Sequence, residues 1–83
     1  MTNDQISDVL DQVADLLEFE GANPFRIRAY RSGSRVVREL PESVSAIVED
    51  ASRTLTDLPG IGKDLAEKIT TLIETGRLPF LDE

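Results

Sequence analysis

An anion-binding loop is indicated by the residue types and spacing of one stretch, Leu58-Pro59-Gly60-Ile61-Gly62-Lys63. Pro59 restricts one backbone angle, while Gly60 and Gly62 permit positive φ and a close approach of a ligand. A helix is expected to begin directly afterwards, and its first amides have no partner inside the helix. Such amides bind phosphate at helix starts. We therefore predict a phosphate-binding backbone here, with Lys63 adding charge and Ile61 anchoring the loop; the alternative is a purely structural turn.

Composition excludes several kinds of chemistry. The 83 residues include no cysteine and no histidine, which excludes disulfides, thiolate nucleophiles and the usual zinc ligands. No segment approaches the ~20 apolar residues of a membrane-spanning helix, and no apolar stretch follows a basic N-terminus. We expect a cytoplasmic chain without a membrane partner or an organic cofactor. Its length fits a single domain over 1–83, whose small core leaves no room for a deep active-site cavity.

The charge of the chain is unevenly distributed. The net charge is −7, yet residues 21–40 carry five arginines against one acidic residue. Residues 1–20 carry six acidic residues and no basic one. A basic island in an acidic chain indicates an oriented anionic partner, such as DNA. The overall charge favours the rival interpretation, an acidic protein-interaction domain without a DNA role.

The elements that must position the loop are all predicted to be helical. No run alternates with period two for long enough to make a strand, whereas apolar residues recur at helical spacing. We predict one compact all-α domain of four to five short helices that ends in a helix-hairpin-helix. The expected segments are residues 3–20, 23–39, 41–50, a turn over 54–58, and 62–75 closed by Gly76.

Two faces are predicted for the helix over 23–39. At 100° per residue, one face collects its apolar residues, which are Phe25, Ala29, Tyr30, Gly33, Val36, Val37 and Leu40. An arginine stripe occupies the opposite face, namely Arg28, Arg31, Arg35 and Arg38, while Arg26 projects near the apolar face. Accessory contacts with DNA are predicted for Arg26, Arg28, Arg31 and Arg35. The alternative is that the stripe pairs with acidic residues of a neighbouring helix.

Three segments of the chain carry a resemblance to a known family. They are NPFRIRAYR over 23–31, LPGIGKDLAEKI over 58–69 and ETGRL over 74–78. In this order they resemble the N-terminal domain of family X DNA polymerases, most closely the bacterial ones. The resemblance implies sequence-non-specific binding of gapped, nicked or 5′-phosphorylated DNA in repair. It also implies a polymerase or phosphoesterase body in the same or another chain. Related hairpins hold a monovalent cation, Na or K, and the matching ligands here are the backbone carbonyls of Thr56, Leu58 and Ile61.

Some members of that family are lyases in which a lysine attacks the sugar aldehyde of an abasic site. The resemblance places Lys68 at the lysine position and Tyr30 at that of a nearby tyrosine. Lys68 is expected at the edge of the last helix's apolar arc, half-buried, where desolvation favours a neutral, nucleophilic amine. Asp64 lies four residues earlier and would form an ion pair that keeps the amine protonated. The alternative is a lysine that lies along the core edge with its amine in water.

The phosphate pocket of the family's active lyases is only partly retained. They carry basic residues at positions that match Arg26, Asp64 and Phe80. Arg26 keeps its charge, Asp64 reverses it and Phe80 lacks it. We therefore expect weak or absent lyase activity, with DNA binding as the main function.

Overall fold

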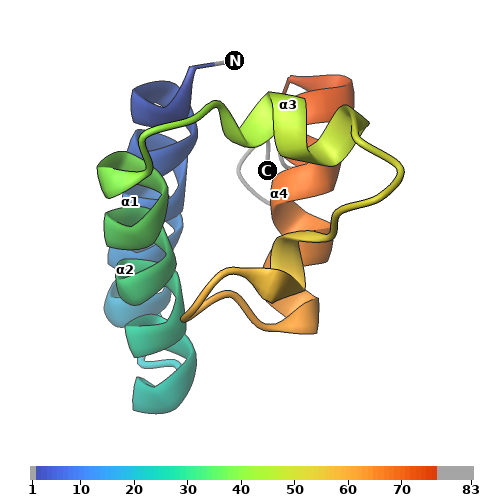
Figure 1. Cartoon of the computed structure of the whole chain (residues 1–83). Helices are drawn as coiled ribbons and strands as arrows, with labels where there is room; N and C mark the ends of the chain where they lie inside the picture. Colours follow the sequence, from blue (N-terminus) through green and yellow to red (C-terminus); the bar gives the residue numbers. More distant parts are fainter. Residues whose placement is uncertain (1, 77–83) are drawn as a thin grey trace.

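The computed structural model describes residues 2–76, and this part of the chain is helical without strands, which confirms the all-α class. Its elements follow the predicted order (Figure 1). They are α1 (Asn3–Phe19), α2 (Pro24–Glu39), α3 (Val44–Glu49), the 3₁₀ helix η1 (Leu55–Asp57) and α4 (Lys63–Thr75). Within residues 2–76, no helix is both long enough and apolar enough to cross a lipid bilayer.

Helices α1 and α2 lie side by side as an antiparallel pair (Figure 1). Two serines join them where the backbones approach: Ser7 Oγ donates to the Ser34 carbonyl (2.9 Å) and Ser34 Oγ donates to the Ser7 carbonyl (3.0 Å). Both side chains are buried, and each satisfies its hydroxyl on the facing helix. Sequence periodicity missed this contact because it assigns serine to solvent.

The segment from α3 to α4 packs on the α1–α2 pair, and the core lies between them. The start of α1 is tied to this segment by Asn3, whose side chain accepts from the Val44 amide (2.9 Å) and donates to the Glu42 carbonyl (2.7 Å). Gly33 lets α4 approach α2, since a Cβ there would lie 2.2 Å from Leu65 Cδ2. The largest fully buried apolar side chains are those of Ile6, Leu10, Val13, Val37, Val44, Ile47, Ile69 and Leu72.

The predicted helix ends are largely confirmed. Thr2 and Gln5 form a capping box on α1, and the Asn23 side chain accepts from the Phe25 amide (2.8 Å) at the start of α2. Gly76 closes α4 with a φ of +79°. The third helix is shorter than the predicted span of 41–50, because Ser43 caps it and it begins only at Val44.

The predicted apolar face of α2 is wrong at Phe25 and Ala29, which are both exposed, Phe25 to 75%. Tyr30, Gly33 and Val37 are buried as expected. The buried arc is rotated toward Ser34 because α2 contacts α1 on one side and α4 on the other. A helix packed between two neighbours buries the arc that faces them, even where that arc includes a small polar residue.

Candidate nucleic-acid interface

The hairpin, residues 58–62, is built around a tight turn. The Ile61 amide donates to the Leu58 carbonyl (3.1 Å), which puts Pro59 and Gly60 at the two central positions. Gly60 has a φ of +85°, the value that a type II turn requires at its third residue. A Cβ at Gly60 would also lie 3.3 Å from Val36 Cγ2 of α2. The predicted positive φ is therefore confirmed at this glycine.

Ile61 fixes the hairpin to the core. Its side chain is only 4% exposed and lies close to Gly33, since a Cβ on Gly33 would be 3.6 Å from Ile61 Cδ1. Leu58 is half-buried against the same core, whereas Pro59 and Gly60 are exposed. The predicted insertion of Ile61 into the core is confirmed.

Gly62 serves a different purpose from the one predicted. Its φ is −84° and its ψ is 174°, an extended conformation that any residue adopts, so the predicted positive φ is wrong here. Gly62 is the N-cap of α4, and its carbonyl accepts from the Ala66 amide (2.9 Å). A Cβ at this position would meet no atom within 4 Å. Gly62 is therefore not needed for an unusual backbone angle. What its missing side chain provides is open space in front of the start of α4.

The N-terminus of α4 has no side-chain cap within the described chain. Helices α1, α2 and α3 each have a side-chain oxygen that accepts an amide of the first turn, from Thr2, Asn23 and Ser43. Glycine offers no such oxygen, and the amides that open α4 have no partner inside the helix. Together with the open space at Gly62, this leaves them accessible to an anion.

Charged side chains of both signs flank these amides. Lys63 and Asp64 are the first two residues of α4, and both are exposed. The carboxylate of Asp64 stabilises the helix dipole but opposes an incoming phosphate. Lys63 contributes the compensating positive charge.

The charges of Arg26 on α2 and Asp64 on α4 both act on the hydroxyl of Tyr30. The Tyr30 side chain is 3% exposed, and its hydroxyl has no hydrogen-bond partner among residues 2–76. Burial raises the pKa of the Tyr30 hydroxyl above its ordinary value of 10.0, the nearby Arg26 guanidinium lowers it, and the Asp64 carboxylate raises it. Arg26 is therefore the predicted accessory arginine that lies on the hairpin side of α2.

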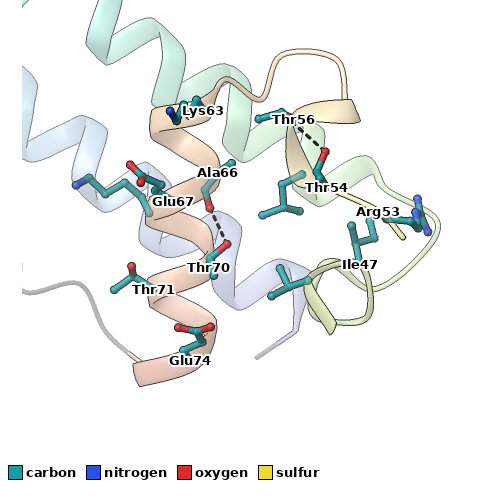
Figure 2. A pocket seen from close by; sticks show the side chains of 13 residues that line it. Ile47, Arg53, Thr54, Thr56, Lys63, Ala66, Glu67, Thr70, Thr71 and Glu74 are labelled. Atoms are coloured by element: carbon teal, nitrogen blue, oxygen red, sulfur yellow. Dashed lines mark hydrogen bonds between the residues drawn. The ribbon is translucent and has the colours of Figure 1, made fainter. Parts of the chain in front are cut away.

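Lys68 is half-buried, as predicted, but its expected ion pair with Asp64 is absent from the described chain. Lys68 and Lys63 line a groove of about 600 Å³ (Figure 2). One wall of the groove is α4, and the other is formed by α3, η1 and the loop between them. Threonines supply much of its polar lining, including Thr54 and Thr70, and sequence reasoning missed them because isolated threonines form no pattern.

The arginine stripe is divided by its contacts. Arg31 binds Asp15 (2.8 Å) and Glu18 (2.7 Å) of α1, as the alternative prediction held. These carboxylates raise the pKa of the Arg31 guanidinium by hydrogen bonding. Arg38 likewise binds Asp8 (2.8 Å). The remaining two, Arg28 and Arg35, make no ion pair with residues 2–76.

The stripe lies away from the hairpin. At 100° per residue, Arg28 and Arg35 lie about 140–160° around α2 from Gly33, which faces α4. Arg26, by contrast, lies about 20° around the helix from Gly33, so the structure places Arg26 on the side of α2 that faces α4 and keeps Arg28, Arg31 and Arg35 on another face.

The cation ligands predicted by resemblance lie along η1 and the hairpin. The carbonyl of Leu58 already accepts the Ile61 amide, and a second lone pair remains for another interaction. The cation itself stays a prediction, as do the roles of Thr56 and Ile61. Phe80 lies outside the described residues.

A glycine turn anchored in the core, followed by a helix with accessible first amides, defines a helix-hairpin-helix module. The chain belongs to the helix-hairpin-helix domain family, which matches residues 1–78. Domains of this class generally bind nucleic acid. No curated protein gives a significant match to the chain.

Proposed function

We propose that this domain binds DNA without sequence preference, at gapped or nicked sites that present a 5′-phosphate. The observation that carries the proposal is the uncapped start of α4 behind the open position at Gly62. Backbone amides contact phosphate oxygens and not base edges, so such binding does not read sequence. Lys63 and Arg26 supply the adjacent positive charge.

A terminal phosphate suits this surface better than an unbroken duplex. A phosphate monoester carries about −1.5 to −2 charges at neutral pH, more than an internal diester, so it interacts more strongly with a helix N-terminus. The chain carries a net charge of −7, which opposes extended contact with a polyanion. Recognition of one phosphate group at a strand end requires few cations.

Fluorescence anisotropy with labelled oligonucleotides tests the proposal. A duplex with a short gap and a 5′-phosphate should bind more tightly than the same gap with a 5′-hydroxyl, and an intact duplex should bind most weakly. Equal affinity for the three DNAs would refute strand-end recognition. No binding at low salt would favour the acidic protein-interaction domain instead.

The resemblance to family X polymerases supports a more specific setting. In that setting the domain acts in DNA repair beside a polymerase or phosphoesterase body, in the same or another chain. A Na or K ion on the carbonyls of Thr56, Leu58 and Ile61 would neutralise part of the phosphate charge. Stronger binding of the gapped DNA in KCl than in N-methylglucamine chloride at equal ionic strength is the expected signature of that ion.

A second candidate function is abasic-site lyase activity. It is favoured by the half-buried Lys68 and by the buried, unpartnered hydroxyl of Tyr30 beside Arg26. The Lys68 amine would add to the C1′ aldehyde and lose water to form an imine. Removal of a C2′ proton would then break the C3′–O bond and release DNA with a 5′-phosphate, and water would regenerate the lysine.

Borohydride trapping on DNA with a 5′-deoxyribose phosphate tests this candidate. We expect weak or no trapping by the parent protein, because Asp64 opposes the 5′-phosphate, and increased trapping by Asp64→Lys. Strong trapping by the parent that disappears in Lys68→Ala would make the lyase the principal function.

A further inference from the structure

Another groove of the described chain lies on the side of α2 that faces away from the hairpin. It has a volume of about 540 Å³ and runs between α2 and the end of α1. Its α2 wall, here called the outer α2 face, consists of Pro24, Ile27, Arg28, Arg31, Ser32 and Arg35. None of these residues is used by the proposed contact with the 5′-phosphate.

The charges on the outer α2 face are only partly neutralised. Arg31 is occupied by Asp15 and Glu18, whereas Arg28 and Arg35 make no ion pair within residues 2–76. Arg28 instead lies over the ring of Phe25, 5.9 Å from its centroid. This arrangement leaves two accessible guanidinium groups on one helix face.

Apolar surface lies beside Arg28, on its N-terminal side, whereas Arg31 and Ser32 line the stretch between the two arginines. Pro24 and the half-buried Ile27 line the groove, and the Phe25 side chain is 75% exposed next to Arg28. Arg28 and Arg35 are two helical turns apart, which corresponds to about 10.5 Å along the axis. A helix packed along α2 would present carboxylates at the same i, i+7 spacing, with apolar side chains beyond the carboxylate that meets Arg28.

We propose that the outer α2 face docks an acidic amphipathic helix of a partner protein. The partner's carboxylates would pair with Arg28 and Arg35, and its apolar residues would cover Pro24 and Ile27. A DNA duplex matches this face less well, because it carries one charge per ~1.7 Å, whereas the face offers two arginines without an ion pair about 10.5 Å apart. Since the hairpin lies on the other side of α2, the domain would hold DNA and this partner together.

A designed peptide provides the probe. It is a fluorescein-labelled helical peptide with glutamates at i and i+7 and with leucines at i−4 and i−1, the positions opposite Pro24 and Ile27 when i is opposite Arg28. Its binding is measured against the 83-residue chain at low salt. Its matched control has glutamine in place of both glutamates. We expect saturable binding of the glutamate peptide and about tenfold weaker binding of the glutamine peptide.

Variants on the two faces separate this site from the hairpin. The double variant Arg28→Gln/Arg35→Gln should bind the glutamate peptide about tenfold more weakly and bind gapped DNA with unchanged affinity. Arg53→Gln, the same change at an arginine paired with Glu42, should leave peptide binding unchanged. Because the two target arginines are exposed, circular dichroism should confirm that the double variant folds.

Several results of the peptide measurements would overturn the proposal. They are absence of saturable binding by the parent, equal affinity for the two peptides, and a peptide affinity that the double variant retains. A large loss of DNA affinity in the double variant would assign the outer α2 face to nucleic acid instead. Amide shifts in the parent's ¹H–¹⁵N spectrum should locate the peptide on residues 24–35; shifts centred on 58–64 would also contradict the proposal.

Discussion

Replacing Gly62 with aspartate should stabilise the fold and weaken DNA binding. Gly62 is the N-cap of α4, its backbone is already in the extended conformation of capping residues, and a Cβ there would meet no atom within 4 Å. An aspartate therefore fits without strain, and its carboxylate would accept the amides that we assign to the phosphate. A folding gain combined with a binding loss is the signature of an anion site at this helix start.

The size of both effects follows from the geometry. Aspartate in place of glycine at an N-cap stabilises by a few tenths of a kcal/mol, and its charge adds about 0.3–1 kcal/mol at the helix dipole. The melting temperature should therefore rise by about 2–8 °C in a domain of this size. Loss of one charge-assisted hydrogen bond to phosphate, worth about 1.5–3 kcal/mol, should weaken binding about ten- to a hundredfold.

Thermal melting and anisotropy with gapped, 5′-phosphorylated DNA measure the two effects. Ser43→Asp is the matched control, since it adds the same charge at the N-cap of α3 and should change DNA affinity by no more than about twofold. Gly60→Ala is the converse variant: it forces a left-handed φ on alanine and should cost about 1–2 kcal/mol of stability. Unchanged DNA affinity in Gly62→Asp would refute the assignment of these amides.

Three further predictions concern the anchor, the ion pairs and the charge of the interface. Ile61→Ala should lower the free energy of unfolding by about 2–5 kcal/mol in a urea titration, because the side chain is 4% exposed; a loss below about 1 kcal/mol would show that the hairpin is not anchored there. Hydrogen bonds from Arg53 and from Ser52 hold the pKa of Glu42 and of Asp50 below their ordinary 4.5 and 3.8. Each carboxylate therefore contributes fully to the stability of the fold above its ordinary pKa and loses that contribution as the pH falls through its lower pKa in the folded protein. The melting temperature should fall on acidification from about pH 4.5, and it should fall less in Arg53→Gln than in the parent. An identical acid profile in the two proteins would contradict the Glu42 assignment. The affinity for gapped DNA should fall with salt on a slope that corresponds to about two to four phosphate contacts, and a slope for eight or more would mean that the acidic surface does not limit contact.

Local sequence signals predicted the fold well where a chain segment determines its own structure. The Asn23-Pro24 start of α2, the Thr2 capping box and Gly76 each act within one helical turn, so their types and spacing were sufficient. The turn at Gly60 is likewise local, and Ile61 follows from its place between two glycines. The hairpin was predictable for the same reason.

The rest depended on how the helices pack. The exposure of Phe25 and the burial of Ser34 reflect the direction of α2 between its two neighbours, which periodicity alone does not define. The pairing of Arg31 with α1 and the absence of the Asp64–Lys68 pair are choices between side-chain partners. A positive φ was predicted at Gly62 because the sequence does not distinguish a glycine needed for its backbone angle from a glycine needed for the open space around it.

The most direct test of the DNA interface is a ¹H–¹⁵N titration of the protein with gapped, 5′-phosphorylated DNA. Hydrogen bonding to phosphate shifts an amide proton downfield, so the largest downfield shifts should fall on the amides of Gly60 and of Gly62 to Asp64, and they should be much smaller with the 5′-hydroxyl DNA. The Ile61 amide, which already donates to the Leu58 carbonyl, should shift less. Shifts centred on Arg28 and Arg35, with residues 58–64 unchanged, would contradict a hairpin that binds the 5′-phosphate.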